Sequence, residues 1–410
     1  MRQLMRQLKV LVSGASIAGP ALALWLARYG AAVTVVERWP ELRTGGQLVD
    51  LRGVAREVIR RMGVEADIRA ASEDNFGLSF VDGRGRSKGK VRADQFGGDG
   101  PVAEIEILRG SLSRVLHEGS RDHVDYRFGD RITSVRDEGA KVRVEFETGP
   151  AESFDVVVGA DGLHSELREM LFGPEARYVR HIGAYVSFWT ARNHLDLKDW
   201  TVVYSEPDRS IGMRSILGST KVMAFLTFRG EAPSYDWRDT DAQKRIAKAR
   251  AYGMGWEAAA LLAQIDTAPD FYFDTCSQVN LPAWSAGRVG LVGDAAYCAS
   301  PLSGHGATIA MVGAYVLAGE LARTPDDITG AFARYEAGLR PWVEWIQRSA
   351  PGQGKVMTPR TRHGIALRNG VTRLAGHLPR KDLLLRNTVR MSNSMVLDDY
   401  SRYAVAAVRP

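Results

Sequence analysis

The chain has 410 residues and a net charge of +6, which is too long for one ordinary domain and suits two domains with sizeable cores. Its apolar share of 45% and charged share of 25% are those of a globular protein, and no stretch approaches the roughly 20 apolar residues that span a bilayer, so we expect a cytoplasmic protein without a membrane partner. Cys276 and Cys298 are too few for a disulfide framework or a cysteine-based metal site, and no metal is expected.

The chain opens with a pattern typical of a strand–helix–strand unit. Lys9–Ser13 is a short apolar run that predicts a buried strand. A turn of small residues follows, then Gly19–Tyr29 has apolar residues at helical spacing, and Gly30 supplies a helix stop. Ala32–Val36 predicts a second buried strand that ends at Glu37. The crossover between the two strands should be right-handed.

The following segments continue this mixed pattern. Helices are predicted over Val54–Met62 and Arg109–Glu118, and a hairpin over Ile132–Asp137 and Lys141–Glu147. Phe154–Gly159 predicts another buried strand.

The pattern changes to alternating strands from about residue 178 to residue 273. The predicted strands are Ala184–Thr190, Thr201–Ser205 and Val222–Phe228, with one helix near Asp241–Leu262. The parallel-sheet pattern returns at Val289–Val292, and a helix is predicted over Ala307–Ala322. A strand-rich domain therefore interrupts the first one.

These segments predict an α/β fold with three parts. A discontinuous Rossmann-like domain takes residues 1–75, 101–177 and 274–345, an inserted and mainly antiparallel β-sheet domain takes 76–100 and 178–273, and a helical segment takes 346–410. Ala350–Gly354 predicts a linker into that last segment. The segment from Ile346 to Pro410 contains twelve Lys and Arg residues and only three acidic residues, but the basic residues are scattered among apolar ones. This favours solvated helices over nucleic-acid binding.

The turn from Gly14 to Gly19 lies where a dinucleotide fingerprint should be. Such a turn aims backbone N–H groups and the positive end of a helix at a pyrophosphate. Ser16 departs from the fingerprint, whose middle position is usually glycine. Glu37 follows Gly14 by 23 residues, where an acid accepts hydrogen bonds from a ribose, and this favours FAD or NAD over NADP. Taken alone, an imperfect fingerprint is also compatible with a purely structural turn.

Two further motifs accompany buried strands: Gly159–Arg168 follows one, and Gly287–Ala296 crosses another. Together with the opening turn and Glu37, they resemble the three signature motifs of the class A FAD-dependent aromatic hydroxylases, the para-hydroxybenzoate hydroxylase-like family that includes tetracycline-modifying monooxygenases. The similarity extends over about residues 8 to 345. The resemblance implies that Asp294 holds the ribityl chain, that Asp161 and Gly162 join the FAD and NAD(P)H sites, and that Arg109 contacts the cofactor.

Pro301–Thr308 resembles the family's loop along the isoalloxazine ring. Tyr297 and Thr308 stand where many relatives carry His and Asn. His305 faces the expected ring; it is either an active-site group or, as is commoner for a lone loop histidine, a structural one. Gln47 falls where relatives have residues near the flavin. The residues expected to bind the cofactor are Gly14, Ser16, Ile17, Ala18, Gly19, Glu37, Arg38, Gln47, Arg109, Asp161, Gly162, Gly293, Asp294, Pro301, Gly304, Gly306, Ala307 and Thr308.

The inserted domain offers Trp189, Met213, Met223 and Phe225 as candidates for a substrate cavity, although a core sheet produces the same pattern. The resemblance implies a monooxygenase that uses FAD, NADPH or NADH, and O₂. It would hydroxylate an aromatic or polycyclic, polyketide-like or antibiotic-like molecule through a flavin C4a-hydroperoxide, acting as a monomer or homodimer. A Baeyer-Villiger outcome and a non-catalytic flavin-containing binding protein are the alternatives. A halogenase is disfavoured because Trp342–Trp345 lacks the Ile-Pro of the halogenase motif.

Overall fold

Both strands of the first strand–helix–strand unit lie in one mostly parallel sheet. The computed structural model describes residues 8–43, 45–73, 75–93, 102–216, 218–230, 235–236, 239–375 and 389–405. Within these residues the sheet has six strands in the order β17 (Ser285–Ala286), β18 (Val289–Leu291), β11 (Val156–Gly159), β1 (Lys9–Ser13), β2 (Ala32–Glu37) and β7 (Val124–Phe128). All neighbours are parallel except β17 and β18. The sheet and the unit α1 (Ala18–Arg28) confirm the predicted Rossmann-like architecture.

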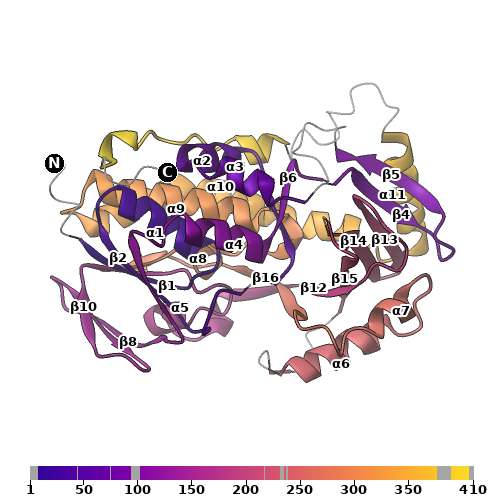
Figure 1. The fold of residues 1–410 in the computed structure, drawn as a ribbon, viewed down its shortest axis with the longest axis horizontal. Coiled ribbons are helices and arrows are strands. Elements are labelled where there is room, and N and C mark those ends of the chain that lie inside the picture. The colour runs from indigo at the N-terminus through magenta and orange to yellow at the C-terminus, as the bar shows by residue number, and fades with distance from the viewer. Residues whose placement is uncertain are drawn as a thin grey trace.

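Helices cover this sheet on the side where α9 and α10 run next to each other (Figure 1). α1 packs against α9 (Gly306–Arg323), and α9 packs against α10 (Ile328–Met357). Val10 and Val12 of β1 are fully buried, as are most residues of α9, which explains their continuous apolar sequence. The remaining helices of this part are α2 (Val54–Met62), α3 (Glu65–Ala70), α4 (Arg109–Glu118), α5 (Glu166–Phe172) and α8 (Asp294–Tyr297).

A second, mainly antiparallel sheet forms the other end of the molecule (Figure 1). In the described part of the chain its seven strands follow the order β16 (Tyr272–Val279), β12 (Val179–Arg192), β15 (Lys221–Arg229), β14 (Arg209–Ser215), β13 (Trp200–Glu206), β4 (Gly77–Val81) and β5 (Ser87–Arg92). α6 (Thr240–Ala251) and α7 (Ala258–Leu262) share a hydrophobic core with one face. The smaller sheets are β8 (Ile132–Asp137) with β9 (Val142–Phe146) and β10 (Glu152–Phe154), and β3 (Leu48–Leu51) with β6 (Ile105–Leu108).

Two predicted elements are wrong because each is divided in the structure. The expected strand Phe154–Gly159 splits at Asp155, whose carboxylate accepts a hydrogen bond from the Lys9 backbone N–H at 2.8 Å. Phe154 therefore ends the antiparallel β10, and Val156 begins the parallel β11. The expected helix Asp241–Leu262 breaks after Ala251, because Gly253 has a φ of +73° and Trp256 a φ of +55°.

The predicted linker Ala350–Gly354 is also wrong, because α10 runs through it to Met357. Pro351 lies inside the helix even though proline removes a helical hydrogen bond. Ala350 is fully buried, and Gly354 packs so closely on Leu302 that a Cβ would lie 2.7 Å from Leu302 Cδ1. Tertiary packing thus overrides the local preference.

The C-terminal part contains α11 (Arg362–Ala375) and a strap of residues 394–405 that returns to the first sheet's helices. The Val405 N–H donates to Arg28 O at 2.8 Å, and Tyr400 Oη donates to Glu320 at 2.8 Å. The short 3₁₀ turns are Glu175–Arg177, Pro301–Ser303 and Ser401–Tyr403. The rest of the expected C-terminal segment, 376–388 and 406–410, lies outside the described residues. Across the described helices, none has the length and apolar character needed to span a bilayer.

Candidate functional site

The predicted fingerprint forms a tight turn between β1 and α1. Gly14 has a φ of +106°, and a Cβ there would lie 2.6 Å from Ala160 O. A Cβ on Gly19 would lie 1.8 Å from Gly14 O, so the helix packs directly on the turn. Ile17 precedes α1 without a side-chain cap, and Ala18 is its first residue. The backbone N–H groups that open α1 are therefore not satisfied by a capping side chain.

The other two predicted motifs meet the same turn. The close contact between Gly14 and Ala160 places the loop of Asp161 and Gly162 beside it, because Asp161 Cα would be 3.2 Å from a Gly14 Cβ. Gly293, with a φ of +67°, lies beside Ala18, whose Cβ would be 3.0 Å from a Cβ on Gly293. All three motifs follow parallel strands of one sheet, and their carboxyl ends meet at the N-terminus of α1.

Glu37 reaches this turn from the end of β2. Its carboxylate accepts hydrogen bonds from the backbone N–H groups of Ala15 at 2.8 Å and Trp39 at 3.0 Å. The neighbouring Arg38 is exposed. A carboxylate is thus fixed beside the fingerprint, where the sequence predicts the ribose end of a dinucleotide.

A buried guanidinium lies beside the turn, at the start of α4. Arg109 donates to Ser16 Oγ at 3.0 Å and to Gly45 O at 3.3 Å, while its Nε is buried without a hydrogen-bond partner among the described residues. Gln47 Oε1 is also buried and has no hydrogen-bond partner among the described residues. Burial, together with the nearby Arg43 cation, lowers the pKa of Arg109. A recess opens there, and its lining includes the cations Arg43 and Arg109 as well as the acids Glu37 and Glu41. The two guanidinium groups offer donors to an anion, and the carboxylates offer acceptors to hydroxyls.

Asp294 is the first residue of α8 and directly follows Gly293. Its side chain is exposed to solvent, yet enough protein surrounds it for desolvation to raise the pKa of its carboxyl, and the Asp274 carboxylate raises that pKa further. A side chain that borders an internal space has both properties. Asp294 therefore offers an acceptor to a ligand that fills the space next to the fingerprint.

The loop Pro301–Thr308 leads into α9, and two of its polar side chains are already engaged. Thr308 Oγ1 donates to Asp50 O at 3.1 Å and accepts from the Arg52 N–H at 3.0 Å. His305 is buried, with its Nδ1 2.5 Å from Ser303 O and its Nε2 3.0 Å from Ser392 Oγ. Both ring nitrogens of His305 thus bond within the chain, which supports the structural interpretation of this histidine.

Backbone groups of the same loop remain available. Pro301 is exposed, Gly304 has a φ of +61°, and a Cβ on Gly306 would have nothing within 4 Å. Ala307 is buried in the first turn of α9. Open space next to a helix N-terminus allows a planar ring to approach the backbone closely.

The four candidate substrate residues lie on different faces of the second sheet. Trp189 and Met213 are fully buried in the core beneath α6 and α7, and Trp189 Nε1 donates to Leu261 O at 3.2 Å. Their placement does not support a role in a cavity. Side chains alternate along a strand, so Met223 and Phe225 lie on the opposite face.

That opposite face carries a buried charge that the sequence analysis missed. Arg214 pairs with Met223 across the strands, and its guanidinium forms an ion pair with Glu106 of β6. Burial and the Asp50 carboxylate raise the pKa of Glu106, while Arg214 opposes them. The signal was present, since one arginine interrupts the apolar run Ile211–Met213 of a strand.

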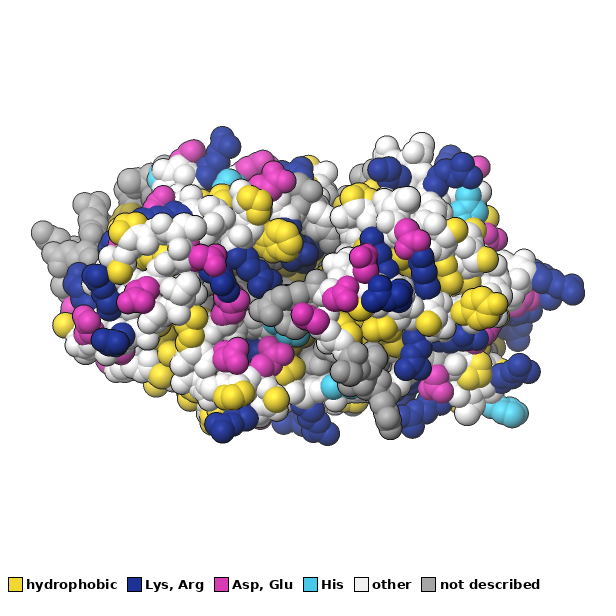
Figure 2. All heavy atoms as spheres, turned by 90° about the horizontal axis from the view of Figure 1, so that it is seen from below, with side chains coloured by type: hydrophobic (Ala, Val, Ile, Leu, Met, Phe, Trp, Pro, Cys, Tyr) yellow, Lys and Arg dark blue, Asp and Glu magenta, His cyan; other side chains and the backbone are white. Residues whose placement is uncertain are grey.

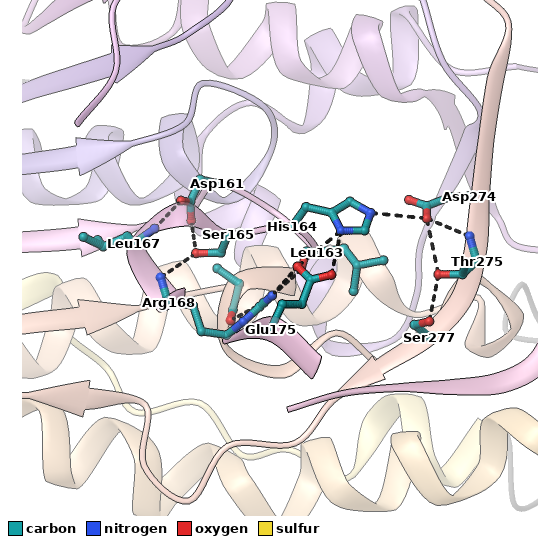
Figure 3. Close-up of polar contacts among 11 residues, drawn as sticks. Asp161, Leu163, His164, Ser165, Leu167, Arg168, Glu175, Asp274, Thr275 and Ser277 are labelled. Atoms are coloured by element: carbon teal, nitrogen blue, oxygen red, sulfur yellow. Dashed lines mark hydrogen bonds and ion pairs between the residues drawn. The ribbon is translucent and has the colours of Figure 1, made fainter. Parts of the chain in front are cut away.

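The Asp161 loop is tied to β16 by a network that the sequence analysis also missed (Figure 3). His164 Nδ1 lies 3.0 Å from Glu175 Oε1, and its Nε2 lies 3.6 Å from Asp274 Oδ1. Burial alone would lower the pKa of His164, but these two carboxylates outweigh it and raise the pKa to about 9. The Asp161 side chain itself accepts from Ser165 Oγ and the Leu167 N–H, so it caps α5. His164 thus joins the motif loop to the second sheet.

Tyr272 extends this network toward the fingerprint. Its Oη donates to Asp274 Oδ2 at 2.8 Å, and Arg109 and Asp294 are close enough to influence its pKa, which burial raises well above its usual value. The phenol therefore lies between the His164 network and the residues expected to hold a cofactor.

Tyr297 explains one departure from the family motif. Its Oη contacts Tyr335 Oη at 3.0 Å, and a Cβ on Gly313 would lie 1.9 Å from it. The side chain is thus packed between α9 and α10, away from any ligand-facing role.

Charges on the lower face of the molecule are mixed in sign. Figure 2 shows Lys and Arg side chains interspersed with Asp and Glu across both halves of this face. This pattern differs from the single basic patch that nucleic-acid binding uses.

Comparisons with known proteins agree on one family. A family model described as "FAD binding domain" matches residues 7–327. An uncharacterised protein of Mycobacterium tuberculosis is 43% identical over 82% of this chain and 90% of that protein. A flavin-dependent monooxygenase from an unknown prokaryote is 39% identical over 83% of this chain and 90% of its own length. The crystal structure of the tetracycline destructase Tet(51) superposes with a TM-score of 0.82 at 33% identity, covering 96% of this chain and 98% of that one.

Proposed function

Because this chain belongs to the FAD-binding-domain family of flavin-dependent monooxygenases, we propose that it hydroxylates an aromatic or polycyclic small molecule, with O₂ and NADPH or NADH as co-substrates. The observation that carries this proposal is the meeting of three motifs at the N-terminus of α1, beside Arg109, whose Nε is buried without a hydrogen-bond partner among the described residues. Bound FAD would supply the redox chemistry, accepting electrons from the pyridine nucleotide and passing them to O₂.

The residues present fit FAD. The unpartnered Arg109 Nε and Gln47 Oε1 are buried polar atoms that a bound ligand would satisfy. The free N–H groups at the start of α1 would hold the pyrophosphate, and Glu37 the adenosine ribose. Asp294 would accept hydrogen bonds from ribityl hydroxyls, and the open backbone at Gly306 would lie along the flavin ring.

The chain's own groups would also prepare the site for substrate. Met223 and Phe225 would offer apolar contacts on the face of the second sheet that also carries the buried Arg214–Glu106 pair. α11 covers the edge of this face, with the Arg368 guanidinium 3.8 Å from the centre of the Phe80 ring. Excluding water and orienting the substrate would be the protein's part of the reaction.

A tetracycline-like polycycle is the first substrate to test. Tet(51), named as a tetracycline destructase, matches nearly the whole chain at 33% identity. We also propose that the two sheets mark two domains, divided near residues 177 and 273 as the sequence indicates.

The proposal predicts a yellow protein when it is purified or loaded with FAD. Under nitrogen, NADPH or NADH should bleach the visible flavin absorbance, and admission of air should restore it. A protein that takes up no FAD, or FAD that neither nucleotide reduces, would contradict the proposal. The control is the same titration with free FAD at the same concentration.

A further inference from the structure

A groove of about 650 Å³ lies on the face of the second sheet that α6 and α7 leave partly uncovered. Val81 of β4 and Val202 of β13 form its floor, and Trp256, just before α7, forms a wall. The alternate residues of the same strands, Phe80 and Val203, point to the opposite face together with Phe225. The groove is therefore separated by the sheet from the candidate active site. We call it the Trp200 groove.

Two indole rings line this groove. Trp200 begins β13, and Trp256 lies in the break between α6 and α7; both are half-buried. Trp256 adopts a φ of +55°, a left-handed backbone that is uncommon for a bulky side chain. The tip of the β4–β5 hairpin packs toward it, since a Cβ on Gly85 would lie 3.7 Å from Trp256 Nε1. Such strain is concentrated at binding sites, where the surrounding structure holds a side chain in place.

The charges in the groove are unbalanced. Lys90 Nζ lies 5.1 Å from the centre of the Trp200 ring, and Arg84 is exposed at the hairpin tip. Neither forms an ion pair with a carboxylate of the described residues, whereas Arg86 and Lys88 on the same hairpin both pair with Asp82.

The acid of the groove, Glu257, forms no ion pair with Lys90 or Arg84. Glu257 lies 2.8 Å from His194 Nε2, and that histidine engages the carboxylate. The Trp200 groove thus combines flat aromatic surface with two cations that form no ion pair with an acid of the described ranges.

We propose that the Trp200 groove is a second small-molecule site, distinct from the active site, that binds planar aromatic anions. The aromatic body of the ligand packs against the indoles of Trp200 and Trp256, and its acidic group pairs with Lys90 and Arg84. The volume of the groove falls within the roughly 300–1,000 Å³ of small-molecule pockets. An anion there gives Lys90 and Arg84 a counter-charge that no carboxylate of the described residues provides through an ion pair.

Calorimetric titration of the full-length, FAD-loaded protein with 2-naphthoate at low salt tests this proposal. We expect saturable binding that Lys90→Glu weakens at least about tenfold, since the substitution turns attraction into repulsion. Arg84→Glu should act in the same direction. The cationic analogue 2-naphthylmethylamine should not compete with 2-naphthoate.

Lys88→Glu is the matched control, because Lys88 lies two positions away on the same strand, is exposed, and pairs with Asp82 outside the groove. It should leave the affinity unchanged. If the titration shows two binding events, the one that persists in both Lys90→Glu and Lys88→Glu belongs to the active site. The event that Lys90→Glu removes and Lys88→Glu retains belongs to the Trp200 groove. The absence of any event that Lys90→Glu weakens selectively would overturn the proposal.

Discussion

Asp294→Ala is expected to bind FAD about 10²–10⁴-fold more weakly than the unmodified chain, since hydrogen bonds to a charged group contribute about 1.5–3 kcal/mol each and Asp294 would accept two from the ribityl hydroxyls. The side chain is exposed to solvent, and the hydroxyls from which it would accept belong to FAD. The loss should therefore appear in cofactor affinity and hardly in the fold of the apoprotein. Quenching of FAD fluorescence during titration of the apoprotein measures it.

Asp122→Ala is the control for this variant, because the Asp122 side chain is 83% exposed. It should bind FAD as the unmodified chain does. If Asp294→Ala also retains full affinity, Asp294 does not hold the cofactor. A circular dichroism spectrum of the apoprotein separates this outcome from misfolding.

His164→Gln is expected to lower the melting temperature in a pH-dependent way. Histidine has a pKa of 6.5 without partners, and Glu175 and Asp274 raise that of His164 to about 9. A raised pKa means that the stabilisation is complete below pH 6.5 and is lost as the pH rises through 9. The shift corresponds to at most about 3 kcal/mol, because one pKa unit corresponds to about 1.4 kcal/mol.

We expect His164→Gln to melt roughly 3–6 °C below the unmodified chain near pH 6 and at nearly the same temperature near pH 10. His123→Gln removes an exposed histidine and should change neither value. A difference between His164→Gln and the unmodified chain that stays constant from pH 6 to pH 10 would show that the charge of His164 is not the cause. Differential scanning fluorimetry across this range, with apoprotein, decides between the two.

Local sequence patterns predict the bounds of a helix or strand correctly where no distant contact overrides the local preference. β1, α2 and α4 have the predicted bounds because their periodicity and the flanking glycines act within a few residues. α10 continues through Pro351 because its next turn packs through Gly354 on Leu302, which lies 52 positions earlier in the chain. A rule based on neighbouring residues cannot include such a distant contact, so the glycines and the proline of this segment predict a linker.

The two faces of the second sheet show a different limit. Both faces are covered, so apolar residues occur at odd and even positions alike, and alternation cannot tell the core under α6 and α7 from the other side. Trp189 and Met213 were therefore grouped with Met223 and Phe225, although they point the opposite way. Only the position of α6 and α7 in space separates them.

The meeting of the three motifs was foreseeable because they lie at the ends of parallel strands, whose carboxyl ends share one edge of the sheet. The His164–Asp274 and Arg214–Glu106 pairs were not, since each joins residues more than 100 positions apart. A charged residue in an apolar strand indicates a buried ion pair, but the sequence does not identify the residue with which it pairs.

The central claim, that this chain is a monooxygenase acting on a polycyclic or aromatic substrate, is tested most directly by isotope labelling. The FAD-loaded protein is incubated with NADPH and ¹⁸O₂ and a panel of such compounds headed by a tetracycline, and each product is analysed by mass spectrometry. The account predicts a product that carries one ¹⁸O atom, formed with substrate-dependent consumption of NADPH. Consumption of NADPH that no compound stimulates, with no labelled product, would contradict it.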